Sequence, residues 1–278
     1  MKPELVWFKR DLRVTDHSPL VAAARRGKVI CIYIYEPDLI GADDFSQRHL
    51  LFINDSLAEL DHNLHKLGSR LLIRCGNAVD VLRSLHAEIG FNCIRAHQET
   101  TNAISYQRDQ AVKKWTRSAG VDFIEYRQQG VVRSMTSRDG WSRQWQGFVS
   151  SPLVSRPTRV LDGGAELRSL GIKSPKSFAL KDDGLTSRQT GGESEAFKLL
   201  NSFLSERSRA YVQGLSSPLT AWDSCSRLSP YLSYGNISLR TLYQRVAVRK
   251  RELQRQRGQR DPWTQSLSNY VERLAWHC

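Results

Sequence analysis

The chain has 278 residues, of which 41 are Lys or Arg and 28 are Asp or Glu, giving a formal net charge of +13. Its 40% hydrophobic content excludes a disordered or fibrous protein. No apolar run approaches the roughly 20 residues of a membrane-spanning helix, and the longest, residues 29–35, is only strand-sized. The five cysteines include no CxxC pair, so we expect a cytoplasmic protein without disulfides or a zinc cluster. The chain opens with a strand-like run directly after residue 3, so we expect no signal peptide, and we expect no membrane partner.

Short apolar segments and longer amphipathic segments alternate through residues 1–130. The expected strands lie at residues 5–8, 29–35, 71–73, 93–94 and 123–124, and the clearest helices at 46–67, 78–89 and 103–119. This order predicts a doubly wound parallel sheet with right-handed crossovers. Such sheets bind ligands at the carboxyl ends of their strands, but the GxGxxG fingerprint is absent, so we predict no Rossmann-type dinucleotide site here.

The charged segment KRDLRVTD, residues 9–16, directly follows the first expected strand. We interpret it as a salt-bridged loop that fixes the turn into the next helix, with a binding site as the alternative. His49, His62 and His65 lie on the polar side of one predicted helix, without a carboxylate or cysteine at ligand spacing. We therefore expect surface histidines and not metal ligands.

Regular periodicity is lost after the sheet region and returns at Glu193. The sequence predicts an α/β domain over residues 1–130, a long interdomain connector over 131–192 and a helical domain over 193–278.

The positive charge is concentrated in the helical domain, because residues 196–278 hold 13 basic and only five acidic side chains. Most of the excess lies on a predicted amphipathic helix over residues 241–257, whose outer face is strongly basic. Nucleic acid is the usual partner of such a surface, but a solvated helix face would give the same count.

The residues around Ser229 form the clearest candidate ligand site. Ser229 followed by Pro230 predicts a helix start with Ser as the N-cap, and Ser226 and Arg227 stand just before it. Two hydroxyls, a guanidinium and a helix N-terminus together make a cradle suited to a diphosphate.

Four segments together resemble the DNA photolyase/cryptochrome family. They are residues 5–16 (LVWFKRDLRVTD), 192–204 (GESEAFKLLNSFL), 226–235 (SRLSPYLSYG) and 273–276 (RLAW). The resemblance implies an α/β sheet domain, a connector and an all-α FAD-binding domain. Family members continue well past residue 278, so the resemblance implies a truncated chain with only the first part of the FAD-binding domain.

The resemblance also implies which residues bind FAD. The diphosphate would be held by Ser226, Arg227, Leu228 and Ser229, with Cys225 where the family usually has Thr. Tyr211 would contact the flavin side, and Tyr270, at a position that is usually Trp, would flank the cofactor. An antenna chromophore of unknown identity is also implied.

Arg273, Trp276 and His277 would face the DNA lesion by the same resemblance, and Arg273 stands where dimer-repairing members often carry Glu. The implied activity is that of a deoxyribodipyrimidine photo-lyase, a carbon–carbon lyase that passes an electron from light-excited reduced flavin to a flipped-out pyrimidine dimer.

We expect a monomer that binds DNA through its basic helical region. We expect this truncated chain to be inactive and to be purified colourless. One alternative is a cryptochrome-like blue-light photoreceptor without repair activity, which Arg273 favours. The other is a nucleotide- and DNA-binding module without flavin chemistry.

Overall fold

The computed structural model describes residues 2–258 and 261–276. The chain forms two compact units, an α/β unit of Met1–Arg127 with Val154–Glu193 and a helical unit of Gln128–Leu153 with Ser194–Cys278. The region predicted as a connector, residues 131–192, is thus divided between the units. The reason is burial, since Trp145 and Val149 are enclosed in one unit and Val160 and Leu167 in the other.

The α/β unit contains a parallel sheet in the order β3-β2-β1-β4-β5, with β6 pairing to β2. Its strands are β1 (Glu4–Phe8), β2 (Lys28–Tyr35), β3 (Leu71–Cys75), β4 (Cys93–His97), β5 (Asp122–Tyr126) and β6 (Leu161–Asp162). Its helices are α1 (Ser18–Ala24), α2 (Pro37–Ile40), α3 (Gln47–Lys66), α4 (Ala78–Ile89), α5 (Ala103–Ala119) and the 3₁₀ helix η1 (Pro175–Phe178). The predicted doubly wound α/β fold is therefore confirmed.

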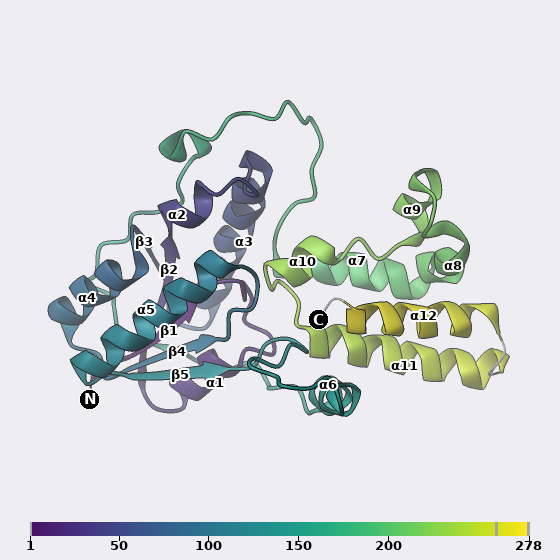
Figure 1. Cartoon of the computed structure of the whole chain (residues 1–278), viewed down its shortest axis with the longest axis horizontal. Coiled ribbons are helices and arrows are strands. Elements are labelled where there is room, and N and C mark those ends of the chain that lie inside the picture. Colours follow the sequence, from purple (N-terminus) through teal and green to yellow (C-terminus); the bar gives the residue numbers. More distant parts are fainter. Residues whose placement is uncertain (1, 259–260, 277–278) are drawn as a thin grey trace. The chain divides into compact units, whose positions relative to one another are not determined.

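Both faces of this sheet are covered by helices (Figure 1). Leu5 and Trp7 of β1 belong to the core cluster that also holds Leu82 of α4 and Val112 of α5. The next residue, Phe8, is fully buried on the opposite face, where its ring lies 4.7 Å from the ring that caps α1. Parallel strands buried on both faces explain the continuous apolar runs of the sequence.

The loop after β1 anchors two distant segments of the α/β unit. The main-chain N–H groups of Val14 and Thr15 donate to the two carboxylate oxygens of Glu193, at 3.0 and 3.1 Å. The Asp16 carboxylate accepts from the N–H of Val154 at 2.9 Å. This loop therefore fixes both ends of the returning segment Val154–Glu193.

The helical unit is built from short helices around one long antiparallel pair. They are α6 (Trp141–Ser150), α7 (Glu193–Ser205), the 3₁₀ helix η2 (Arg207–Ala210), α8 (Tyr211–Gly214), α9 (Pro218–Ser224), α10 (Ser229–Ser233), α11 (Leu239–Arg257) and α12 (Pro262–Trp276). Helices α11 and α12 lie side by side (Figure 1), and α6 packs on α11. None of the helices in the described residues is long and apolar enough to cross a membrane.

Candidate functional site

The predicted diphosphate-binding residues form one turn between α9 and α10. Cys225 is extended, Arg227 has a φ of +59°, and Leu228 is helical with φ −91° and ψ −1°. Leu228 and not Ser229 is the N-cap of α10, so the predicted N-cap is wrong by one residue. The cause is the left-handed conformation of Arg227, which starts the helical turn one residue earlier.

The side chains of this turn divide into buried and exposed groups. Ser226 is buried, accepts from the Leu228 N–H at 3.3 Å, and contributes a side-chain hydrogen bond to Tyr270. Ser229 is exposed. Arg227 stacks on the ring of Trp222, with its Cζ 4.5 Å from the ring centroid. The serine hydroxyls therefore have different roles, since Ser226 shapes the turn and Ser229 is open to a ligand.

Tyr211 and Tyr270, which the resemblance assigns to the flavin site, lie next to each other in the helical unit. Their rings lie 5.3 Å apart, and both pack on Phe203, at 5.9 and 4.7 Å. Burial raises the pKa of both phenols, and the nearby guanidinium of Arg273 acts in the opposite direction on Tyr211. Both phenols therefore stay protonated, and the cluster is a rigid aromatic wall in the helical unit.

The residues predicted to face DNA lie on the last turn of α12. Arg273 is exposed, and its Cζ lies 5.2 Å from the ring centroid of Trp276, whose side chain is 76% exposed. Trp276 also borders a cavity of about 680 Å³ lined by residues 131–142 of the same unit. His277, the third predicted residue, lies outside the described residues.

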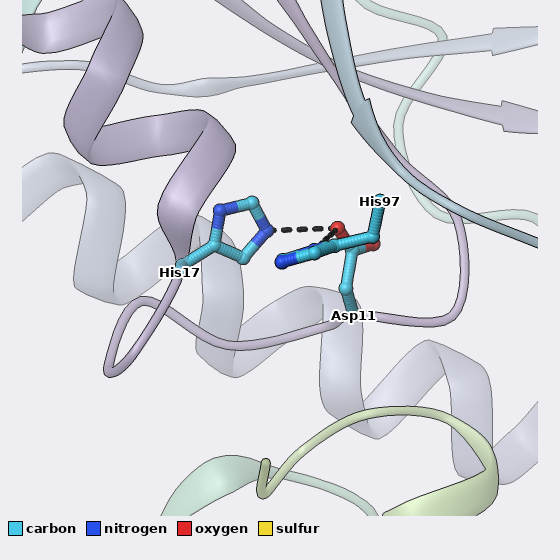
Figure 2. A group of neighbouring side chains, drawn as sticks. All are labelled: Asp11, His17 and His97. Carbon is cyan, nitrogen blue, oxygen red and sulfur yellow. Dashed lines mark hydrogen bonds and ion pairs between the residues drawn. The ribbon is translucent and has the colours of Figure 1, made fainter. Parts of the chain in front are cut away.

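A second polar site lies in the α/β unit, at the carboxyl ends of β1 and β4 (Figure 2). The carboxylate oxygen Oδ2 of Asp11 lies 2.8 Å from His17 Nε2 and 2.7 Å from His97 Nδ1, and all three side chains are buried. Strand order reverses between β1 and β4, which is where doubly wound sheets place their ligand crevice. Lys9 N–H donates to the other carboxylate oxygen at 2.7 Å.

This cluster fits a hydrogen-bond network better than a metal centre. His17 caps α1, and its Nδ1 accepts from the Leu20 N–H at 3.1 Å. The proton of the neutral ring is therefore on Nε2, which donates to Asp11 and has no lone pair for a metal. The separations of 2.7 and 2.8 Å are hydrogen-bond distances, whereas tetrahedral zinc ligands lie about 3.3 Å apart.

The electrostatics agree with a charged aspartate in this network. Burial acts to raise the pKa of Asp11, but the interactions with His17 and then His97 outweigh it and hold that pKa well below its usual range. Burial also lowers the pKa of His97 to about 3, against the opposing hydrogen bond to Asp11. Asp11 therefore remains ionised in the folded protein near neutral pH.

An ionic cluster lies beside this network. Arg108 pairs with Glu36 through Nη1, with Asp109 through Nε at 2.8 Å, and with Glu99 through Nη2 at 3.6 Å. Lys9 pairs with Asp109 at 2.8 Å. Burial raises the pKa of Glu36 to about 7 even though Arg108 and Lys9 lower it.

The sequence did not reveal His17, His97 or Arg108 as members of a site. Residues 9–16 form a fixed loop as predicted. The carboxylate of Asp11 in this loop, however, pairs with two histidines and not with the charged side chains beside it in the sequence. His17, His97 and Arg108 all lie near the carboxyl ends of strands. A prediction of the strand order would have placed these three side chains at one edge of the sheet. The three predicted surface histidines, His49, His62 and His65, belong to no metal-type cluster among the described residues.

Comparisons with known proteins find similar sequences over most of the chain. The model of the DNA photolyase family matches residues 4–142. Cryptochrome-2 of Arabidopsis thaliana is 28% identical over 269 residues, covering 87% of this chain and 42% of the relative. Cryptochrome DASH of Gloeobacter violaceus is 26% identical over 272 residues, covering 88% and 53%. The chain thus spans about half the length of the curated relatives it matches.

Solved structures share the fold over the whole chain. A class III photolyase from Agrobacterium tumefaciens has a TM-score of 0.78 at 22% identity, covering 100% of this chain and 57% of its own. A cryptochrome of Synechocystis sp. PCC6803 reaches 0.81 at 22% identity, covering 100% and 60%. An archaeal photolyase from Sulfolobus tokodaii, solved with two FAD molecules, reaches 0.69 at 25% identity, covering 90% and 58%. Since the family model matches half of the chain and the relatives span most of it, the chain belongs to the DNA photolyase/cryptochrome family.

Proposed function

We propose that this chain is a photolyase/cryptochrome-type flavoprotein segment that binds FAD through the turn at residues 225–229 and DNA through helix α11. The observation that carries the proposal is the turn itself. The turn combines the left-handed Arg227 and the exposed Ser229 with a second guanidinium, that of Arg207. Burial lowers the pKa of Arg207, and the nearby positive charge of Arg227 lowers it further. A diphosphate is negatively charged and would form charge-assisted hydrogen bonds with guanidinium groups at this turn.

The residues present fit the diphosphate part of FAD. Arg227 and Ser229 would contact it, Ser226 would hold the turn in shape, and Tyr211 and Tyr270 would provide an apolar wall beside it. Bound reduced FAD supplies light-driven electron transfer to a pyrimidine lesion. The residues of this chain would bind and orient FAD and exclude water from it. We assign no residues to an antenna chromophore.

FAD titration tests the proposal directly. We expect the purified chain to be colourless, because relatives are about twice as long, but to bind added FAD with quenching of flavin fluorescence. Arg227→Gln should weaken binding by about tenfold or more, since a charge-assisted hydrogen bond contributes about 1.5–3 kcal/mol. Arg188→Gln, in the α/β unit, is the matched control. Equal binding of ADP and the absence of any flavin preference would favour a nucleotide-binding module instead.

A second candidate function is photoreception without lesion repair. The observation that favours it is the exposed guanidinium of Arg273 on the ring of Trp276, where repair members often carry a carboxylate. Illumination of thymine-dimer DNA with the FAD-loaded chain separates the two functions. Restored thymine absorbance would identify repair, whereas flavin photoreduction without it would identify a photoreceptor.

Helix α11 offers a smaller basic surface than its sequence indicates. Arg240 and Arg249 are used within the helical unit, where they donate to the main-chain oxygens of Pro152 and Leu204. The remaining exposed cations with described side chains include Arg245, Arg251 and Arg255. These are the side chains that we assign to the phosphate backbone of DNA.

Salt dependence tests this assignment. The triple change Arg245→Gln, Arg251→Gln and Arg255→Gln should reduce the slope of log K against log salt for duplex DNA by up to about 3, because each lost phosphate contact removes about 0.9. Filter binding at several salt concentrations measures it. A control triple removes three exposed cations of the α/β unit, at positions 83, 114 and 117. An unchanged slope in the α11 variant would show that DNA binds elsewhere or not at all.

A further inference from the structure

The guanidinium of Arg207 connects helix α7 to the turn at residues 225–229 through hydrogen bonds. Its Nε donates to Ser202 Oγ at 3.0 Å and its Nη2 to the carbonyl of Leu199 at 2.8 Å. On the other side, Nη1 donates to the carbonyl of Cys225 and Nη2 to that of Ser226 at 3.4 Å. The side chain is half-buried and lies beside Phe203, with Cζ 5.7 Å from the ring centroid.

These contacts orient the backbone of the turn. Two consecutive carbonyls, those of Cys225 and Ser226, are held toward one cation. The next two residues, Arg227 and Leu228, are left-handed and right-handed in turn. A pair of this kind forms a concavity of main-chain N–H groups that binds anions. A left-handed non-glycine residue costs about 1–2 kcal/mol, so the turn needs an external restraint such as this clamp.

We propose that Arg207 is a positioning residue that holds the turn at residues 225–229 in its anion-binding shape, and that the anion is the diphosphate of a dinucleotide. The inference rests on the proposed function for the identity of the ligand. Four of the five guanidinium N–H groups are committed to protein acceptors, so Arg207 acts through the backbone and not as the main phosphate contact.

Charge at the site supports a ligand of this class. Burial lowers the pKa of Arg207, and repulsion from Arg227 lowers it further, while the carboxylate of Asp223 acts in the opposite direction. Two guanidinium groups thus lie near one carboxylate around the turn. A bound diphosphate would relieve the repulsion between them.

The test compares Arg207→Gln and Arg207→Lys with Arg209→Gln, a neighbouring exposed arginine of the same 3₁₀ helix. Hydrogen–deuterium exchange of the ligand-free chain, followed over a peptide spanning residues 222–232, reports the turn without any cofactor. Titrations with FAD and with inorganic pyrophosphate report the site. We expect both Arg207 variants to exchange faster in this peptide and to bind each probe about tenfold more weakly or worse.

The outcomes separate the two levels of the proposal. If Arg207→Lys restores both protection and affinity, charge and not the fork of donors is what matters, and the positioning role is overturned. The role is also overturned if Arg207→Gln exchanges like the wild-type chain. If the wild-type chain binds neither probe while the Arg207 variants lose protection, the positioning role stands and the proposed FAD function fails.

Discussion

Replacement of Asp11 by Ala is expected to lower the free energy of unfolding of the α/β unit by about 3–5 kcal/mol. The carboxylate accepts hydrogen bonds from Lys9 N–H, His17 Nε2 and His97 Nδ1, and all of these groups are buried. Removing it leaves three donors without an acceptor in a place that water does not reach. The two imidazole rings also lose the negative charge that both of them contact.

Urea denaturation followed by far-UV circular dichroism measures this loss. Asp11→Asn retains the shape and one acceptor oxygen, so we expect a smaller loss than for Asp11→Ala. Asp80→Ala on helix α4 is the matched control, because its exposed side chain pairs with the exposed Arg83. A stability of Asp11→Ala within about 1 kcal/mol of the control would contradict the network described here.

Replacement of Arg108 by Ala is expected to have an effect of similar size, about 3–5 kcal/mol at neutral pH. Arg108 is the buried cation shared by Glu36, Glu99 and Asp109, and its Cζ also lies 4.7 Å from the ring centroid of Trp7. Without it, the three carboxylates lose the buried cation that they share, while Lys9 still pairs with Asp109.

The pH dependence gives this prediction a direction. The folded pKa of Glu36 is raised from its ordinary 4.5 to about 7, so the stability contributed by its neutral form is present in acid and is lost as pH rises through about 7. Without Arg108 the ionised form is less favourable still. The destabilisation by Arg108→Ala should therefore be smaller near pH 5 than near pH 8.

Chemical denaturation of both variants across this pH range measures the effect. The double variant Arg108→Ala, Glu36→Gln serves as the control, because it lacks the titrating group and should recover part of the loss at alkaline pH. A destabilisation by Arg108→Ala that is the same at both ends of the range would mean that Glu36 does not titrate there.

Hydrophobic periodicity was sufficient to predict the sheet and its large helices. The helix over residues 46–67 has a continuous buried stripe, and Ser46 is its N-cap. A helix after the loop at residues 9–16 was expected, but the bounds of α1 were not predicted, since it is seven residues long and is capped by a histidine side chain, which is an uncommon N-cap. Local pattern was also insufficient for the segment after residue 130, because its buried residues such as Val160 and Leu167 have no regular spacing.

The candidate sites show the same division between local and non-local information. Ser226, Arg227 and Ser229 are neighbours in sequence, and a motif is enough to group them. His97 lies 86 positions after its partner Asp11, and the two meet only because β4 pairs with β1. Arg207 is separated in sequence from Cys225 and Ser226 by helices α8 and α9, yet it donates to both of their carbonyls. No spacing rule would connect these residues. Side chains that bind main-chain carbonyls leave no pattern in a sequence.

The division of the chain has a consequence for its biogenesis. The edge strand β5 ends at Tyr126, yet the α/β unit is completed only by residues up to Glu193, whose carboxylate accepts from the N–H groups of Val14 and Thr15. A ribosome therefore has to release almost 70 further residues before the first unit can close, and it releases helix α6 of the second unit on the way. Strands β1 to β5 therefore leave the ribosome before the segment that completes their unit, which is the stage at which chaperone binding would matter most.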